Sequence, residues 1–226
     1  MGDVLGQLMA PAVGILLSPL PIVGVILMLL SQRAKQNGSA FLIGWIIGMA
    51  ALVTIVVLVT DPSDLTDADS APSTLSGVIH LVLALLLWFL AFQQWQKRPA
   101  DGATPEMPKW MAGIDSMTPL VALGFGAFLS SLNPKNLIMN IAAGTAIAGA
   151  ELSSGQIVVA MLVFIIIASL AIGGAVIWFL LAGESANATL DKMRGFLVQY
   201  NAVIMAVLFL VLGFSMMGKA IPAFIS

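Results

Sequence analysis

The sequence predicts an all-α integral membrane protein whose six transmembrane helices form two inverted repeats of three helices. Three observations lead to this fold class. Hydrophobic residues make up 60% of the 226 residues, charged residues only 9%, and the mean hydropathy is +1.05, which is far from the composition of a soluble domain. Apolar stretches of about 20 residues, the length that crosses a bilayer as a helix, follow one another along the chain. Two of these stretches are interrupted by prolines at corresponding places.

The first span, at about residues 4–30, is predicted to be an interrupted helix. It contains Pro11 and then the motif SPLP at residues 18–21, and a proline both removes a backbone donor and kinks a helix. The segment lacks the basic residues and the clear cleavage site that a signal peptide would need. We therefore expect this helix to be retained.

The second span, at about residues 39–60, carries Gly44 and Gly48 in the sequence GWIIG. This spacing of small residues lets two helix backbones approach each other closely. Two interpretations follow: the glycines pack against another helix of the same chain, or they form the face of a homodimer. Internal packing is favoured over the homodimer.

The polar segment at residues 61–74 contains four aspartates and no basic residue. It lacks the glycine and the terminal glutamate of an EF-hand loop, so a solvated outer loop is favoured over a calcium site. The third span follows at about residues 75–95 and contains His80, the only histidine. This histidine could relay protons or be held by a neighbouring carbonyl, and the second role is favoured.

The fourth span, at about residues 118–148, contains the motif NPK within an apolar stretch. A continuous helix of roughly 30 residues would extend about 45 Å, against a hydrocarbon core of about 30 Å. Pro134 therefore favours a broken helix. Lys135 beside it is costly, because an ammonium at mid-bilayer costs about 2.5 to 3.5 kcal/mol on insertion scales. Some compensating interaction is required.

The fifth and sixth spans, at about residues 156–182 and 196–218, complete the chain. Seven of the nine Lys and Arg residues fall in the first, third and fifth connections, which the positive-inside rule places in the cytoplasm. Both termini are then expected outside. The seven residues are Arg33, Lys35, Lys97, Arg98, Lys109, Lys192 and Arg194.

The two interrupted helices carry related motifs. Several positions are identical when GILLSPLP, which begins at Gly14, is set over GAFLSSLN, which begins at Gly126. This alignment brings Ser18 onto Ser130, and a shift by one residue brings Pro21 onto the proline of NPK. An odd number of spans per half makes the halves oppositely oriented, and paired Gly/Pro interruptions in inverted halves indicate the binding site of a transporter.

We therefore expect residues 1–226 to form one membrane transporter domain. Repeat one covers about residues 1–96, a cytoplasmic loop covers about 97–117, and repeat two covers about 118–226. The loop contains the sequence MPKWMAGID, in which a lysine beside a tryptophan indicates a short piece lying at the membrane interface.

Composition also limits the chemistry of the chain. Zero cysteines and one histidine exclude disulfides, thiolate metal sites and a metal site built from several histidines. All eleven acidic residues fall in tails or loops, so no carboxylate is expected within a span. The sequence has no GxxxxGK[ST] phosphate loop and no HExxH motif. We expect a protein that is not an enzyme, holds no cofactor or metal and binds no nucleic acid.

Four segments resemble a known family. LSPLPIVGVILMLLS, RAKQNGSAFLIGW, KRPADGATPEMPKWMAGID and FLSSLNPKNLIMNIAAG are similar to the LysE-type exporter superfamily, and most closely to its Gap-like branch, the peptidoglycolipid- or sulfolipid-addressing proteins. The resemblance implies a six-helix exporter that moves an envelope glycolipid or its precursor across the bacterial inner membrane. The first motif is SPLP, whereas amino-acid exporters carry PGP, and this difference argues against an amino-acid substrate.

We expect the substrate site near the midplane, between the first and fourth helices. Lys135 would be the counter-charge of an anionic or strongly polar headgroup, and the serines and asparagines would supply hydrogen bonds. The prolines would shape the breaks. In the alternative, Lys135 bonds carbonyls of the broken helix and only holds the fold. The expected site residues are Ser18, Pro19, Pro21, Ser130, Ser131, Asn133, Pro134, Lys135, Asn136 and Asn140.

Three functions remain open at this point. The first is a secondary exporter of lipid-linked or other anionic cargo by alternating access, with His80 or Lys135 as the available proton carriers. The second is an amino-acid or small-metabolite exporter of the same fold. The third is a non-transporting scaffold for an envelope-lipid synthesis or export complex. The expected partners are the lipid bilayer and a lipid or small polar substrate.

Overall fold

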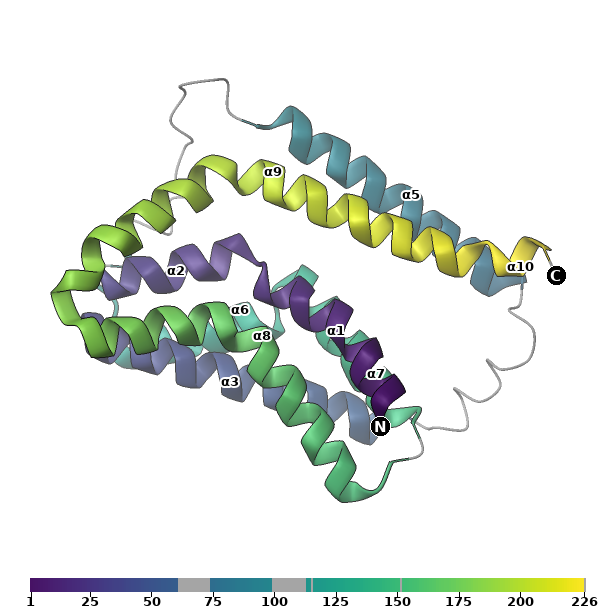
Figure 1. Cartoon of the computed structure of the whole chain (residues 1–226), viewed down its shortest axis with the longest axis horizontal. Helices are drawn as coiled ribbons and strands as arrows, with labels where there is room; N and C mark the ends of the chain where they lie inside the picture. The colour runs from purple at the N-terminus through teal and green to yellow at the C-terminus, as the bar shows by residue number, and fades with distance from the viewer. Residues whose placement is uncertain (61–73, 99–112, 115, 151, 226) are drawn as a thin grey trace. The chain divides into compact units, whose positions relative to one another are not determined.

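The computed structural model describes residues 1–60, 74–98, 113–114, 116–150 and 152–225, and these residues form helices and no strand (Figure 1). The segments predicted as an outer loop and as an interfacial piece, at residues 61–74 and 96–117, lie largely outside the described residues. The main elements are α1 (Gly2–Leu16), α2 (Pro19–Leu29), α3 (Ala34–Val59), α5 (Thr74–Gln96), α6 (Pro119–Ser131), α7 (Pro134–Ala148), α8 (Ser154–Ala182), η3 (Gly183–Ala186), α9 (Asn187–Ala220) and α10 (Pro222–Ile225).

Several helices are long and apolar enough to cross a membrane. Within the described residues, Ala34–Val59 and Ser154–Gly218 meet this criterion by themselves. The consecutive helices α1 and α2 meet it together as one broken span, bent by 52°. Shorter apolar helices lie at Leu81–Gln96 and Pro119–Ser131. The predicted all-α membrane fold class is confirmed at this level, with two or three candidate spans.

The chain divides into two compact units. The first consists of Met1–Asp61 and Met107–Leu197, and the second of Pro62–Glu106 and Val198–Ser226. In the first unit α3 packs most extensively against α6, and it also contacts α7 and α8. In the same unit α1 packs against α7 and α8, and α2 packs against α3 and α8. Figure 1 shows α1 and α7 running side by side.

Glycines allow the close approach of α3 and α6. A Cβ atom added to Gly44 would overlap the carbonyl oxygen of Leu123, and one added to Gly48 would lie 2.5 Å from Ser130 Oγ. Gly126 faces α3 in the same way, against the backbone of Phe41. The interpretation that Gly44 and Gly48 pack within the chain is therefore confirmed.

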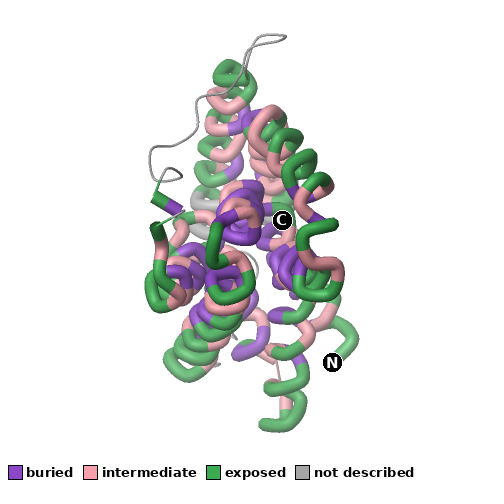
Figure 2. The backbone as a smooth tube through the Cα atoms, turned by 90° about the vertical axis from the view of Figure 1, so that its left-hand side faces the viewer, coloured by how far each residue is buried: buried purple, intermediate pink, exposed green. Residues whose placement is uncertain are grey.

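α8 of the first unit has a packed side and an exposed apolar side, whereas α2 has no exposed residue. On α8, Phe164 and Ile172 are buried, whereas Leu162 and Ile166 are more than half exposed, at 53% and 60%. Figure 2 shows buried and exposed residues alternating along the individual helices. Apolar side chains that face away from a core are expected where a helix meets lipid, because no hydrophobic penalty opposes that exposure in a bilayer.

The second unit contains α5, most of α9 and α10. The ring of Trp88 meets the ring of Phe214 edge-on at a centroid distance of 5.1 Å, and Gly213 leaves the space that Trp88 occupies. α10 packs against α5. The backbone of His80 lies in α5, but its side chain is outside the described part of the structure.

Candidate functional site

Both proline motifs break their helices in the same way. α1 ends at Leu16 and α2 begins at Pro19, while α6 ends at Ser131 and α7 begins at Pro134. Proline is favoured at the first position of a helix, because its missing N–H would be unsatisfied there anyway. The predicted interruption of both helices, at SPLP and at NPK, is confirmed.

The residue before each proline has an extended backbone. Ser18 has φ −81° and ψ 103°, and Asn133 has φ −61° and ψ 124°, as expected because proline disfavours the helical region for the preceding residue. The structure therefore makes Ser18 equivalent to Asn133. This corrects the sequence alignment, which set Ser18 over Ser130 and required a shift to bring Pro21 onto Pro134. Pro19 and Pro134 hold the same position, the first residue of the helix that follows each break.

The two breaks are joined directly by hydrogen bonds. Lys135 Nζ donates to Ser18 Oγ at 2.7 Å, and Ser18 Oγ donates to Asn136 Oδ1 at 3.0 Å. Asn136 Nδ2 in turn donates to the carbonyl oxygen of Leu129 at 2.8 Å. Ser18 and Asn136 are buried and Lys135 is partly buried. Three of the predicted site residues thus form one continuous chain between the two halves of the sequence.

Asn140 extends this network by one helical turn. Its Nδ2 atom donates to the carbonyl oxygens of Ser130 at 2.9 Å and of Asn136 at 2.8 Å. Its Oδ1 atom is buried and has no partner among the described protein atoms. The last carbonyls of a helix have no intrahelical donor, so Asn136 and Asn140 satisfy groups that the break after α6 leaves free.

The remaining predicted site residues have local roles. Asn133 caps α7, because its side-chain oxygen accepts from the backbone N–H of Lys135 at 3.2 Å. Ser130 and Ser131 both donate to the carbonyl oxygen of Ala127, at 3.0 and 2.6 Å, so their hydroxyls serve their own helix. The three prolines, Pro19, Pro21 and Pro134, lie in the first turns of α2 and α7.

The sequence missed two partners in this cluster, the carbonyl groups of Leu129 and Ser130. No side-chain pattern reveals a backbone acceptor. The signal that could have found them is the position of the proline: a helix that begins at Pro134 requires the preceding helix to end with unsatisfied carbonyls. The contact of Gly14 with Met139, where an added Cβ would lie 3.2 Å from the sulfur, was also not predicted.

The cluster contains one basic side chain, that of Lys135. In the part of the chain that the structure describes, the ion pair is Arg194 with Asp191 at 2.7 Å, and Lys135 has no carboxylate partner. No group of three metal-ligating side chains occurs among those residues. The N-termini of α2 and α7 meet at Ser18, and the N-terminal end of a helix carries partial positive charge. The site can therefore attract an anion, as half-helix N-termini do in transporters.

These features define a class: an all-helical membrane protein in which two proline-broken helices meet at a polar cluster that contains a lysine. The chain belongs to the family described as Sap, sulfolipid-1-addressing protein, whose family model matches residues 8–222. Searches of curated proteins and of solved structures gave no match.

Proposed function

We propose that this protein is a secondary transporter that moves a lipid with an anionic or strongly polar headgroup across the bacterial inner membrane. The observation that carries the proposal is the contact between Lys135 and Ser18, which joins the two helix breaks at 2.7 Å. In this account the protein is not an enzyme, and it works without a cofactor.

The packing of the first unit supports an inverted repeat. Suppose that the helices of repeat one correspond to those of repeat two, with α1 matching α6, α2 matching α7 and α3 matching α8. For every two of these helices that pack together, their matching helices also pack together. The one exception is the pair of consecutive helices α6 and α7. For example, α3 with α6 becomes α8 with α1. A pseudo-two-fold relation between two sets of helices produces this pattern.

The division into compact units agrees with the same relation. Each unit takes one part from the first half of the sequence and one from the second half. The first unit holds the expected first two spans of each repeat, and the second unit holds the expected third span of each. This distribution supports one transporter domain with repeats at about residues 1–96 and 118–226 and a loop at about 97–117.

Six crossings fit the lengths of the helices. The segment Ser154–Gly218 has 65 residues, and a straight helix of that length would extend about 98 Å, some three times a hydrocarbon core of about 30 Å. Within it α8 ends at Ala182 and η3 begins at Gly183, whose φ is +59°. This turn separates two crossings, α8 and α9. Together with α3, α5 and the two broken pairs, α1 with α2 and α6 with α7, they make six crossings. The lysines and arginines then place both termini outside.

The position of the contact supports alternating access. Lys135 belongs to the second repeat and Ser18 to the first, so a local movement of one helix break against the other would separate and remake their hydrogen bond. An anionic headgroup can replace Ser18 as the partner of Lys135, and the positive ends of α2 and α7 favour it. The missing carboxylate at the site would thus be supplied by the cargo.

The family supports a lipid as the cargo. The family is described as addressing a sulfolipid, and a sulfated headgroup has the charge that Lys135 and the helix ends would accept. We propose an acidic envelope glycolipid or its precursor as the substrate class. The lipid bilayer and the proteins that make or export such lipids are the proposed partners.

A reversible cross-link between the repeats tests alternating access. The chain has zero cysteines, so Gly14→Cys with Met139→Cys introduces one pair at the α1 and α7 contact, outside the polar cluster. The readout is the movement of a fluorescent sulfatide across proteoliposomes, followed by back-extraction into albumin, which leaves the disulfide intact. Oxidation should stop transport and reduction should restore it, while each single variant stays active. Full transport by the oxidised pair would contradict the mechanism.

A further inference from the structure

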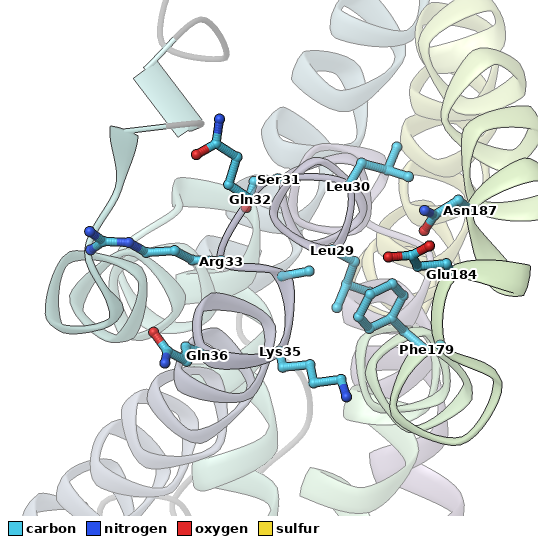
Figure 3. A pocket seen from close by; sticks show the side chains of 12 residues that line it. Leu29, Leu30, Ser31, Gln32, Arg33, Lys35, Gln36, Phe179, Glu184 and Asn187 are labelled. Carbon is cyan, nitrogen blue, oxygen red and sulfur yellow. The ribbon is translucent and has the colours of Figure 1, made fainter.

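A cavity of about 610 Å³ lies where α2 ends, α3 begins and α8 joins α9. We name it the head pocket. Its polar lining includes Arg33, Lys35, Gln36, Glu184 and Asn187, and its apolar wall is formed by α2 and α8. Figure 3 shows the Lys35 side chain extending toward Phe179, on the same side as Glu184, with Arg33 on the other side of the first turn of α3.

A second cavity, of about 450 Å³, lies against the same helices, and we name it the tail pocket. Ile22 of α2, Ala171 of α8, and Phe196 and Leu197 of α9 give it a largely apolar lining. Lys192 is the one charged residue in this lining. The character of the tail pocket is thus opposite to that of the head pocket.

The two pockets share three helices, α2, α8 and α9. Leu29 of the head pocket is seven residues from Ile22 of the tail pocket on α2, and Phe179 is eight residues from Ala171 on α8, which corresponds to about 10 to 12 Å of helix. On α9 the two linings come within two residues of each other, at Asn187 and Thr189. We therefore treat the two neighbouring pockets as one groove.

The tail pocket also approaches the polar cluster. The backbone N–H of Ile22 bonds the carbonyl oxygen of Ser18 at 3.4 Å, so the deep end of the groove lies one helical turn from the break. The head pocket is formed by the first and fifth connections, which the positive-inside rule places in the cytoplasm. The groove therefore runs from the cytoplasmic interface toward the Ser18 and Lys135 contact.

We infer that this groove binds one lipid of the cytoplasmic leaflet, with its anionic headgroup at Lys35 in the head pocket and one acyl chain in the tail pocket. The inference rests on the proposed function and adds a loading site to it. A polar pocket followed by an apolar one matches an amphiphile, and the Lys35 ammonium group matches a phosphate or sulfate.

Glu184 provides a test of the charge preference of the head pocket. Its side chain is exposed within the head pocket, and it makes no ion pair among the residues that the structure describes. A carboxylate beside an anionic headgroup is repulsive. The Glu184→Gln variant should therefore bind an anionic lipid more tightly than the wild type, whereas Lys35→Gln should bind it more weakly.

The experiment measures lipid binding to the purified full chain in mixed micelles by native mass spectrometry. The probes are sulfatide and galactosylceramide, which differ by one sulfate group. Lys35→Gln should reduce sulfatide binding by roughly three- to tenfold, the effect of one partly screened charged contact, and should leave galactosylceramide unchanged. Ala171→Phe, which fills the tail pocket, should weaken both lipids. Lys97→Gln, an exposed lysine outside both pockets, is the matched control.

The outcomes separate this inference from the proposed function. Equal sulfatide binding by the wild type, Lys35→Gln and Glu184→Gln would overturn the headgroup assignment, and unchanged binding by Ala171→Phe would overturn the acyl-chain assignment, whether or not the wild type transports lipid. Displacement of sulfatide by sodium sulfate at constant ionic strength would indicate a site for the free anion and would also overturn it. Lipid binding with this pattern but no translocation by the wild type would contradict the transporter proposal alone.

Discussion

The Nζ atom of Lys135 lies 2.7 Å from the Oγ atom of Ser18, although 117 residues separate them in the sequence. Each residue lies at the break of its own proline-interrupted helix, and Asn136 accepts from the same hydroxyl at 3.0 Å. One short hydrogen-bonded chain thus couples the two breaks. A lysine that is costly in an apolar span is compensated here by a partner from the other half of the protein.

The Lys135 and Ser18 side chains should be energetically coupled. In a double-mutant cycle of Ser18→Ala and Lys135→Met, we expect a coupling energy of about 0.5 to 3 kcal/mol, the range for residues in one hydrogen-bonded network. Denaturation in mixed micelles measures the four free energies of unfolding. The matched cycle of Ser18→Ala with Lys97→Met should give a coupling near zero. Equal coupling in both cycles would mean that the contact contributes nothing specific.

Removal of the Asn140 side chain should destabilise the fold. Its amide satisfies the buried carbonyls of Ser130 and Asn136, and a buried group left unsatisfied costs about 1 to 3 kcal/mol. We expect Asn140→Ala to lower the free energy of unfolding by that amount. Thr145→Ala is the control on the same helix, because the exposed Thr145 hydroxyl bonds only its own helix. A similar effect of both substitutions would refute the role of Asn140.

Two glycine substitutions should have opposite effects on the stability of the protein. Gly44→Ala places a methyl group against the backbone of Leu123, so α3 and α6 must separate, at a cost of about 1 to 3 kcal/mol for overpacking. Gly174 lies in α8 with open space around it, and Gly174→Ala should stabilise by about 0.5 to 1 kcal/mol, the helix preference of alanine over glycine. Thermal unfolding of both variants measures the difference. A stable Gly44→Ala protein would show that α3 and α6 do not pack this closely.

Cysteine labelling should reveal the orientation of the chain. The absence of native cysteines makes single variants unambiguous. Gln36→Cys lies at the start of α3 and should react with an impermeant maleimide only from the cytoplasmic side. Gly149→Cys lies after α7 and should react from the outside. Labelling of both from the same side would exclude the proposed six-span topology.

The sequence was informative where a local rule controls the backbone. The apolar runs predicted an all-helical membrane fold, and the two proline motifs predicted the interruptions, because proline acts on its immediate neighbours. The favoured internal packing of Gly44 and Gly48 was also found. These features need only one or two residues and the general properties of helices.

The sequence was less informative where a choice depends on tertiary contacts. Alignment by residue identity placed Ser18 opposite Ser130. In the structure, however, Ser18 and Asn133 hold the same position, immediately before the helix that follows each break. Ser130 and Ser131 carry the right groups for a binding site, yet their hydroxyls bond the carbonyl of Ala127 in their own helix, an alternative that is always available to serine in a helix. Tertiary packing decides whether a serine hydroxyl bonds a residue of the other repeat or a carbonyl of its own helix.

The most direct test of the central claim is transport by Lys135→Met. Fluorescent sulfatide movement in proteoliposomes should fall by about tenfold or more, because a lost charge-assisted hydrogen bond is worth roughly 1.5 to 3 kcal/mol, while thermal unfolding shows a folded protein. Lys97→Met, at an exposed lysine away from the cluster, should transport like the wild type. A folded Lys135→Met protein that moves sulfatide at the wild-type rate would contradict the claim that Lys135 receives the headgroup.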